Sequence, residues 1–223
     1  MSELSMPDTH GDLVRIHRLI SRALDVSTEN CRSLAQGAAM VGPIRDGFAS
    51  YLQTFVNVVH GHHTVEDLIF FPFFRDRLPE VPFDAFASEH NTMKALLEDM
   101  STAIDSMAAD TKMARASARL HDLLVQVAQT WHPHIRGEES HFTEERVAAA
   151  ATPEELASLS DQISQHNQEH SRPLELVVPF LLYNLEPEDR AIFSRQIPSF
   201  VVDELVPVTW KQQWEPMKPF LLR

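Results

Sequence analysis

The sequence predicts an all-α protein, an up-and-down four-helix bundle with a helical C-terminal extension. Apolar residues recur at steps of three and four through most of the 223 residues, and no long alternation of apolar and polar residues suggests an exposed sheet. Glycine is scarce, with six in the chain, whereas eight of the 14 prolines lie in the last 73 residues. Long helices with short connections are typical of an up-and-down bundle.

Four helical segments form the predicted bundle, which we place in residues 1–150. The first segment has Asp8 or Thr9 as its N-cap, because both side chains can accept from free N–H groups of the first turn. The third begins near Pro82, since proline favours a first-turn position. The fourth has Thr111 as its candidate N-cap. The predicted segments span about 9–26, 44–78, 82–108 and 111–149.

Residues 151–223 form the predicted extension. A fifth segment starts after Thr152, where the sequence TPEE is a typical helix start, and reaches about residue 184 with interruptions at Pro173 and Pro179. We expect the aromatic tail to dock on the bundle of its own chain; gating of the site and a dimer contact are the alternatives. Shorter helical pieces are predicted at 187–197 and 199–206, followed by this tail at 207–223.

Each bundle segment has one apolar face that is interrupted only by histidine and glutamate. In chain order the faces are Leu13, His17, Ile20 and Leu24; Leu52, Phe55, Val59, His62, Glu66, Ile69 and Phe73; Phe83, Phe86, His90, Met93, Leu97, Met100 and Ile104; and Leu120, Leu124, Val127, Trp131, His134, Glu138 and Phe142.

These polar positions predict a metal pair inside the bundle. A buried imidazole needs a hydrogen-bond partner, and a buried carboxylate must be paired, protonated or bound to metal. The faces carry no Arg or Lys at the same level, and two His-x-x-x-Glu pairs place their side chains about 5–6 Å apart on one side of a helix. Imidazole and carboxylate donors without thiolate suit iron or manganese, with zinc as a further option. The candidate ligands are His17, His62, Glu66, His90, His134 and Glu138.

Composition excludes several other classes of protein. A single cysteine, Cys31, excludes an internal disulfide framework and a Cys-rich metal site. The net charge of −13 argues against binding to nucleic acid or to anionic membranes. No apolar run approaches the roughly 20 residues of a membrane helix, and no secretory signal is evident. We therefore expect a cytoplasmic protein with no nucleic-acid or membrane partner.

The histidine and glutamate motifs, in their order and spacing, resemble the hemerythrin-like family, also called the HHE cation-binding domain, over about residues 9–149. They read RIHRLI at 15–20, HHTVEDLIFFP at 62–72, EHN at 89–91 and HIRGEESHF at 134–142. The resemblance implies a four-helix bundle around two non-haem iron ions. It also implies that the six candidate residues are the ligands and that Glu66 and Glu138 bridge the metals.

The sequence departs from the oxygen-carrying members of that family at Lys94, where they have a second histidine on the third helix. Six ligands leave exchangeable positions on both metals, which favours chemistry with O2 or peroxide over reversible carriage. Pro133 and Gly137 lie inside the fourth segment and should weaken it. They indicate either a kink that aims His134 or a broken helix that misplaces the second pair.

Three further histidines have two interpretations each, and one glutamate has a single one. His166 and His170 form a His-x-x-x-His on the fifth segment. They either bind iron or hold an iron ligand in place or, as we favour, form hydrogen bonds with neighbours. His63 should point about 100° away from His62, which favours the surface over the edge of the site. Glu139 is expected on a solvated face.

The leading functional prediction is a non-haem di-iron protein that binds or reacts with O2 or peroxide, with a small molecule as an additional partner. Oxidase, oxygenase and peroxidase- or catalase-like activities are the candidates. An iron or oxygen sensor without turnover is the alternative, and a purely structural helical bundle is the third. The expected assembly is a monomer or a homodimer.

Overall fold

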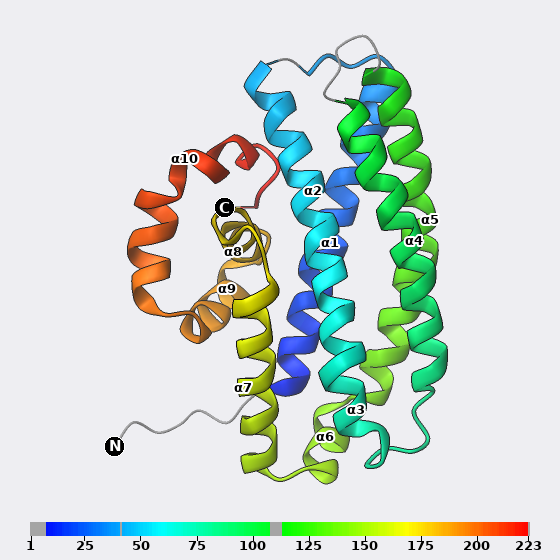
Figure 1. The fold of residues 1–223 in the computed structure, drawn as a ribbon, viewed down its shortest axis with the longest axis vertical. Helices are drawn as coiled ribbons and strands as arrows, with labels where there is room; N and C mark the ends of the chain where they lie inside the picture. The colour runs from blue at the N-terminus through cyan, green and yellow to red at the C-terminus, as the bar shows by residue number, and fades with distance from the viewer. Residues whose placement is uncertain (1–7, 41, 108–112, 223) are drawn as a thin grey trace.

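The computed structural model describes residues 8–40, 42–107 and 113–222. Four long helices lie side by side, and successive ones run in opposite directions along the long axis (Figure 1). Helix α1 packs on α5, α5 on α4 and α4 on α2, and α1 also contacts α2. The described residues contain no strand, so the all-α prediction is confirmed. The helices are α1 (Thr9–Ala35), α2 (Gly42–Val65), α4 (Phe83–Met107) and α5 (Met113–His141).

Helix α1 begins as predicted and ends nine residues later than predicted. Asp8 is the N-cap, and its side chain accepts a hydrogen bond from the backbone N–H of Gly11. Small buried side chains, Ser27 and Cys31, continue the inner face after residue 26, and Leu34 completes it. The helix therefore continues through a stretch that lies outside the predicted segment.

The second predicted segment contains a change of helix type. Helix α2 is followed by a π-helical turn, η1 (Glu66–Phe70), and by α3 (Phe71–Arg75). The backbone N–H of Phe71 bonds to the carbonyl of Glu66, five residues back. This wider turn advances the inner face by one residue. The buried residues are accordingly Phe70 and Phe74, and the predicted Ile69 and Phe73 are only partly buried.

The fourth predicted segment is two helices instead of one. Helix α5 runs through Pro133 without a break and ends at His141. A new helix, α6 (Glu144–Ala150), then starts at Thr143, whose side chain accepts from the N–H of Arg146. Thr111 lies outside the described residues.

The extension has its predicted start and one of its two predicted breaks. Thr152 and Glu155 form a capping box at the start of α7. The chain breaks at Pro173, whereas Pro179 lies inside the next helix. The elements are α7 (Pro153–His170), α8 (Leu174–Tyr183), α9 (Pro187–Phe193), η3 (Ser194–Gln196), η4 (Val201–Thr209), α10 (Lys211–Trp214) and η5 (Glu215–Met217).

The C-terminal tail docks on its own bundle, as expected. Its 3-10 turn η5 packs against α2, and the Met217 side chain is fully buried. Gly47 of α2 permits this contact, because a Cβ atom there would overlap the backbone of Pro216. The hydroxyl of Tyr51 donates to the side chain of Asn184 at 2.9 Å, which ties α2 to the end of α8.

Two apolar clusters fill the interior. One combines α1, α2, α4 and α5 with the C-terminal tail, and it includes Trp131 and Met93. The other is rich in phenylalanine and joins η1 and α3 to α4, α6 and α7. No helix within the described ranges combines the length and apolar character that a membrane crossing requires.

Candidate metal centre

A compact group of histidine and glutamate side chains lies inside the bundle, between the two apolar clusters. All six candidate ligands are brought together there, and their side chains are at most 7% exposed. They come from α1, α2, η1, α4 and α5. The residues are His17, His62, Glu66, His90, His134 and Glu138.

His63 also lies inside this group, and the expectation that it faces the surface is wrong. The residue is 4% exposed, and its ring stacks on that of His90 with centroids 4.1 Å apart and an interplanar angle of 14°. Each helix of a bundle has two neighbours, so its buried arc is wider than one stripe. A side chain 100° from His62 therefore points toward α4 instead of toward water.

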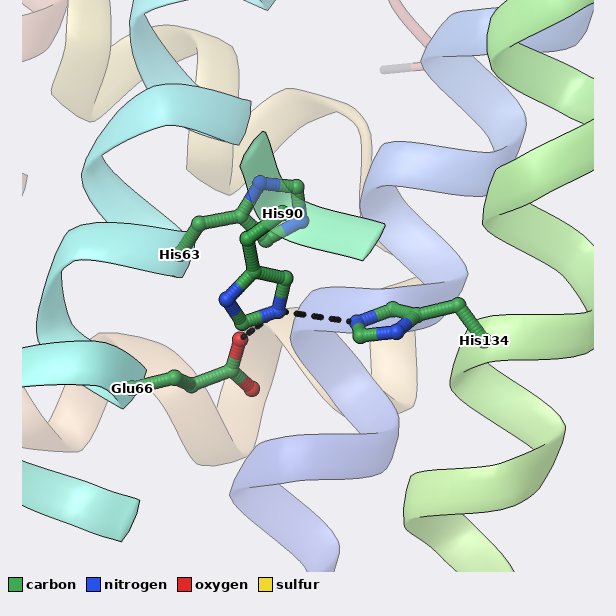
Figure 2. Close-up of side chains that lie close together, drawn as sticks. All are labelled: His63, Glu66, His90 and His134. Carbon is green, nitrogen blue, oxygen red and sulfur yellow. Dashed lines mark hydrogen bonds and ion pairs between the residues drawn. The ribbon is translucent and has the colours of Figure 1, made fainter. Parts of the chain in front are cut away.

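The donor atoms form two groups that share Glu66. Within each group the atoms that could bind a metal lie within 4.8 Å of one another. Figure 2 shows the first group, in which the rings of His63, His90 and His134 and the Glu66 carboxylate converge from α2, η1, α4 and α5. The second group contains His17, His62, Glu66 and Glu138.

Each of the two glutamates directs its oxygens at both groups. Glu138 has Oε2 3.2 Å from Nε2 of His17 and Oε1 3.2 Å from Nε2 of His134. Glu66 has Oε1 3.4 Å from Nε2 of His62 and Oε2 3.5 Å from Nε2 of His90. A carboxylate in this position can bridge two cations, one on each side.

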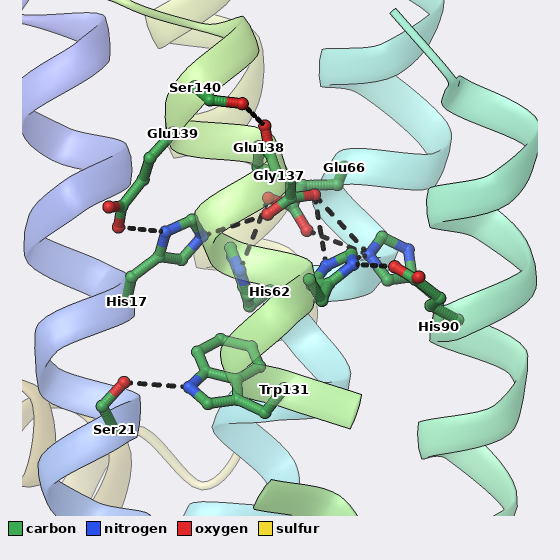
Figure 3. Close-up of polar contacts among 12 residues, drawn as sticks. His17, Ser21, His62, Glu66, His90, Trp131, Gly137, Glu138, Glu139 and Ser140 are labelled. Carbon is green, nitrogen blue, oxygen red and sulfur yellow. Dashed lines mark hydrogen bonds and ion pairs between the residues drawn. The ribbon is translucent and has the colours of Figure 1, made fainter. Parts of the chain in front are cut away.

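Three of the histidines form hydrogen bonds with carboxylates that belong to neither group of donor atoms. Nδ1 of His17 bonds to Glu139 at 2.9 Å, as Figure 3 shows. Nδ1 of His90 bonds to Asp67 at 2.9 Å, and Nδ1 of His134 bonds to Glu89 at 2.8 Å. Such a carboxylate accepts the Nδ1–H and leaves Nε2 as the metal-facing donor, an arrangement that is common around ligating histidines.

These three carboxylates were not identified from the sequence, and Glu139 is not the purely solvated residue that we expected. Each of these side chains is partly exposed, so its polarity alone does not distinguish it from an ordinary surface residue of a helix. Their positions in the sequence could have identified them, because each is next to a candidate ligand. Asp67 follows Glu66, Glu89 precedes His90, and Glu139 follows Glu138.

The residues fit a bound cation because many of their buried polar atoms have no other partner. Both oxygens of Glu66 and of Glu138 lack a hydrogen bond, as does Nε2 of three of the histidines. Nε2 of His90 lies 3.0 Å from Nε2 of His134, although Nδ1 of both rings already faces a carboxylate. Two such nitrogens can come this close only when a proton or a metal ion lies between them.

Without a metal, burial favours the neutral forms of Glu66, His62 and His63. Burial, followed by the charge of Glu138, raises the pKa of Glu66 well above its usual value. Burial also acts on Glu138, but the close polar contacts and charges of His134 and His17 outweigh it and lower the pKa of that carboxyl to about 2. Burial and the neighbouring histidines lower the pKa of His62 and His63 well below the usual value.

Aromatic rings close the site on two sides. The Trp131 ring lies 5.6–6.3 Å from four of the site histidines, and its Nε1 donates to Ser21 at 2.9 Å. On the other side the Phe71 ring stacks on His90 at 5.5 Å. These rings exclude water, which strengthens the electrostatic interactions between the donors and a cation.

Pro133 and Gly137 do not displace the second His-x-x-x-Glu pair, since α5 is continuous and His134 lies next to Glu138. The ring of Phe86 accounts for the glycine, because a Cβ atom on Gly137 would lie 3.0 Å from it. Phe86 in turn contacts the His134 ring edge-on, with centroids 5.5 Å apart.

The histidine pair of α7 lies outside the centre. His170 is exposed and His166 is half-buried, and neither belongs to the two groups of donor atoms. Nδ1 of His170 bonds to the backbone oxygen of His166 at 2.9 Å. The structure therefore supports the reading in which these histidines bond to neighbours.

No curated protein and no solved structure gives a significant match to this chain. A family model does match, over residues 8–145, and its description is Hemerythrin HHE cation binding domain. The matched range covers α1 to the start of α6 and contains every donor residue of the two groups. The chain therefore belongs to the hemerythrin HHE cation-binding domain family.

Proposed function

We propose that this chain is a non-haem di-iron protein whose centre reacts with O2 or peroxide. The observation that carries the proposal is that Glu66 and Glu138 each direct one oxygen toward either group of histidines. Two cations bridged in this way would lie side by side in the bundle core. Iron suits the mixture of imidazole and carboxylate donors, with manganese and zinc as the competing ions.

The donor set divides the histidines unequally between the two metals. His17 and His62 would hold one ion, and His63, His90 and His134 would hold the other. His63 thus supplies the additional nitrogen that Lys94 does not. The two-histidine group supplies fewer protein donors than the three-histidine group, so it would leave more room for an exogenous ligand such as O2 or peroxide.

The protein would contribute positioning and a dry environment. An iron pair supplies electrons for the reduction of O2 or peroxide when it is bound. Glu139, Asp67 and Glu89 orient three of the rings, and they connect these rings to solvent because they are 33–42% exposed. Protons that leave the buried groups on metal binding can pass to these carboxylates. Trp131 and Phe71 keep bulk water away from the donors.

The test begins with metal loading. Chelator-treated protein is titrated with Fe2+ without oxygen, and we expect about two ions per chain. Hydrogen peroxide is then added, and its loss is followed with an electrode. The matched variants are Glu66→Leu, which removes a bridging group, and Glu98→Gln, which changes an exposed glutamate of α4. Peroxide loss well above that of free iron is expected from wild type and from Glu98→Gln, but not from Glu66→Leu.

Fewer than one iron per chain in several loaded preparations would contradict the di-iron proposal. Two irons per chain without reaction above the free-iron rate would instead support an iron sensor. One contact favours this second function: α7 of the extension packs against η1, which carries Glu66. A sensor predicts that iron changes the protease sensitivity of residues 151–222, and an unchanged digestion pattern would contradict it.

A further inference from the structure

A pair of histidines on the surface of α7 takes no part in the buried centre. The sequence contains a single His-x-x-x-His, formed by His166 and His170. Residues four apart lie on the same side of a helix, one turn from each other. The two rings are stacked, with centroids 4.2 Å apart and an interplanar angle of 18°. They are therefore already side by side.

The contacts of these rings leave nitrogen lone pairs available. Nδ1 of His170 donates to the backbone oxygen of His166, which makes Nε2 of His170 the free acceptor. Within the described part of the chain neither ring has a carboxylate partner, unlike three of the buried histidines. Because both side chains reach solvent, their rings can turn so that one nitrogen of each faces the same ion.

We propose that His166 and His170 form a second cation site, on the protein surface, that binds a borderline divalent ion such as Cu2+, Ni2+ or Zn2+. Two imidazoles without a carboxylate suit these ions better than Fe2+ or Mn2+. A pair at this spacing is the arrangement by which helices commonly supply two histidines to one metal. The net charge of −13 raises the concentration of cations near the protein. Water completes the coordination, so the ion exchanges readily.

Retention of untagged protein on a Ni2+-chelate resin tests this proposal. Immobilised Ni2+ reaches surface histidines and cannot enter the bundle core. We expect wild type to be retained and the double variant His166→Gln/His170→Gln to pass through. His60→Gln removes an exposed histidine of α2 and should leave retention unchanged. The variant His166→Gln/Gln168→His keeps the number of histidines but places them two residues apart, on different sides of the helix, and should also pass through.

A titration with Cu2+ in solution measures the stoichiometry. Wild type should take up about one equivalent more than the double variant, while the iron content after loading with Fe2+ stays equal in both proteins. Equal retention on the resin, or equal Cu2+ uptake by both proteins, would overturn the proposal. Neither measurement depends on whether the buried centre holds iron, so the two proposals can fail separately.

Discussion

Replacement of Glu66 by glutamine should change the stability of the protein in opposite directions with and without metal. Both oxygens of Glu66 are buried without a hydrogen bond, and among neighbouring charges that of Glu138 has the largest effect on this carboxyl. Burial and this charge raise the pKa of Glu66 above its unfolded value. A raised pKa in a carboxyl group means that the folded state binds an additional proton, so the free energy of unfolding falls as pH rises above about 4.5.

Glutamine has nearly the same shape and no charge to desolvate. In chelator-treated protein at neutral pH, Glu66→Gln should therefore raise the free energy of unfolding by about 1–3 kcal/mol, because glutamine is neutral without taking up a proton, and keeping a carboxyl protonated costs about 1.4 kcal/mol per pH unit above its unfolded pKa. For a chain of this size each kcal/mol shifts the Tm by about 2–4 °C, which gives a rise of roughly 2–12 °C. The gain should shrink as pH falls and disappear below about 4.5, where the Glu66 carboxyl is neutral in both the folded and the unfolded state.

With Fe2+ present the order should reverse. Ligand binding stabilises the folded state by about 2.7 kcal/mol when the free metal is at 100 times its Kd. The amide nitrogen of glutamine cannot serve as the second bridging donor, so the variant should lose most of this stabilisation. Thermal unfolding followed by circular dichroism, with and without Fe2+, measures both effects. Glu98→Gln is the control, and we expect it to change neither curve.

A metal-free Glu66→Gln protein that melts below wild type, or one that gains as much stability from Fe2+ as wild type does, would refute this reasoning. The first result would mean that Glu66 is satisfied without a cation. The second would mean that it does not hold the metal.

Three other predictions follow from single contacts. Glu89→Gln removes the carboxylate that orients His134 and should weaken metal binding by about 10–100-fold in a competition with a coloured chelator; unchanged affinity would contradict the orienting role. Gly47→Ala should displace the C-terminal tail from α2 and make the tail accessible to carboxypeptidase. The control is Gly61→Ala, where an added Cβ meets no neighbour, and this variant should raise the free energy of unfolding by about 0.5–1 kcal/mol. The Cys31 thiol is buried, and burial raises its pKa to about 12, so a thiol reagent should label it only after unfolding.

Most of the bundle and the burial of the six candidate ligands could be predicted because both depend on one pattern, the apolar face of an amphipathic helix. A histidine or glutamate on such a face is a polar side chain among apolar ones, and this contrast identifies it as a candidate ligand. His17 and Glu138 were found in this way, and each is at most 1% exposed.

His63 could not be found by the same rule, because the rule reduces a helix to one buried line. In the bundle α2 contacts α4 as well as α1, so a ring beside the line is also buried. The register error after Glu66 has a different cause. The π-turn η1 adds a residue to the helix, and side-chain polarity does not show that i→i+5 hydrogen bonds replace i→i+4 bonds there.

The carboxylates that bond to Nδ1 of three histidines show a third limit of predicting the site from sequence. Asp67, Glu89 and Glu139 are partly exposed, and nothing in their own sequence neighbourhood except adjacency to a ligand distinguishes them from surface residues. Their role depends on which histidine ring lies opposite them on another helix or turn, and only the tertiary structure determines this. The sequence-based prediction therefore named six candidate ligands and omitted the carboxylates that bond to three of the histidine rings.

The most direct test of the central claim is anomalous X-ray scattering at the iron edge from crystals of the iron-loaded protein. We predict two peaks in the bundle core, one beside His17 and His62 and the other beside His63, His90 and His134, with Glu66 and Glu138 between them. Iron peaks found only on the surface, or a core without anomalous scattering in fully loaded crystals, would contradict the claim that these buried side chains hold a metal pair.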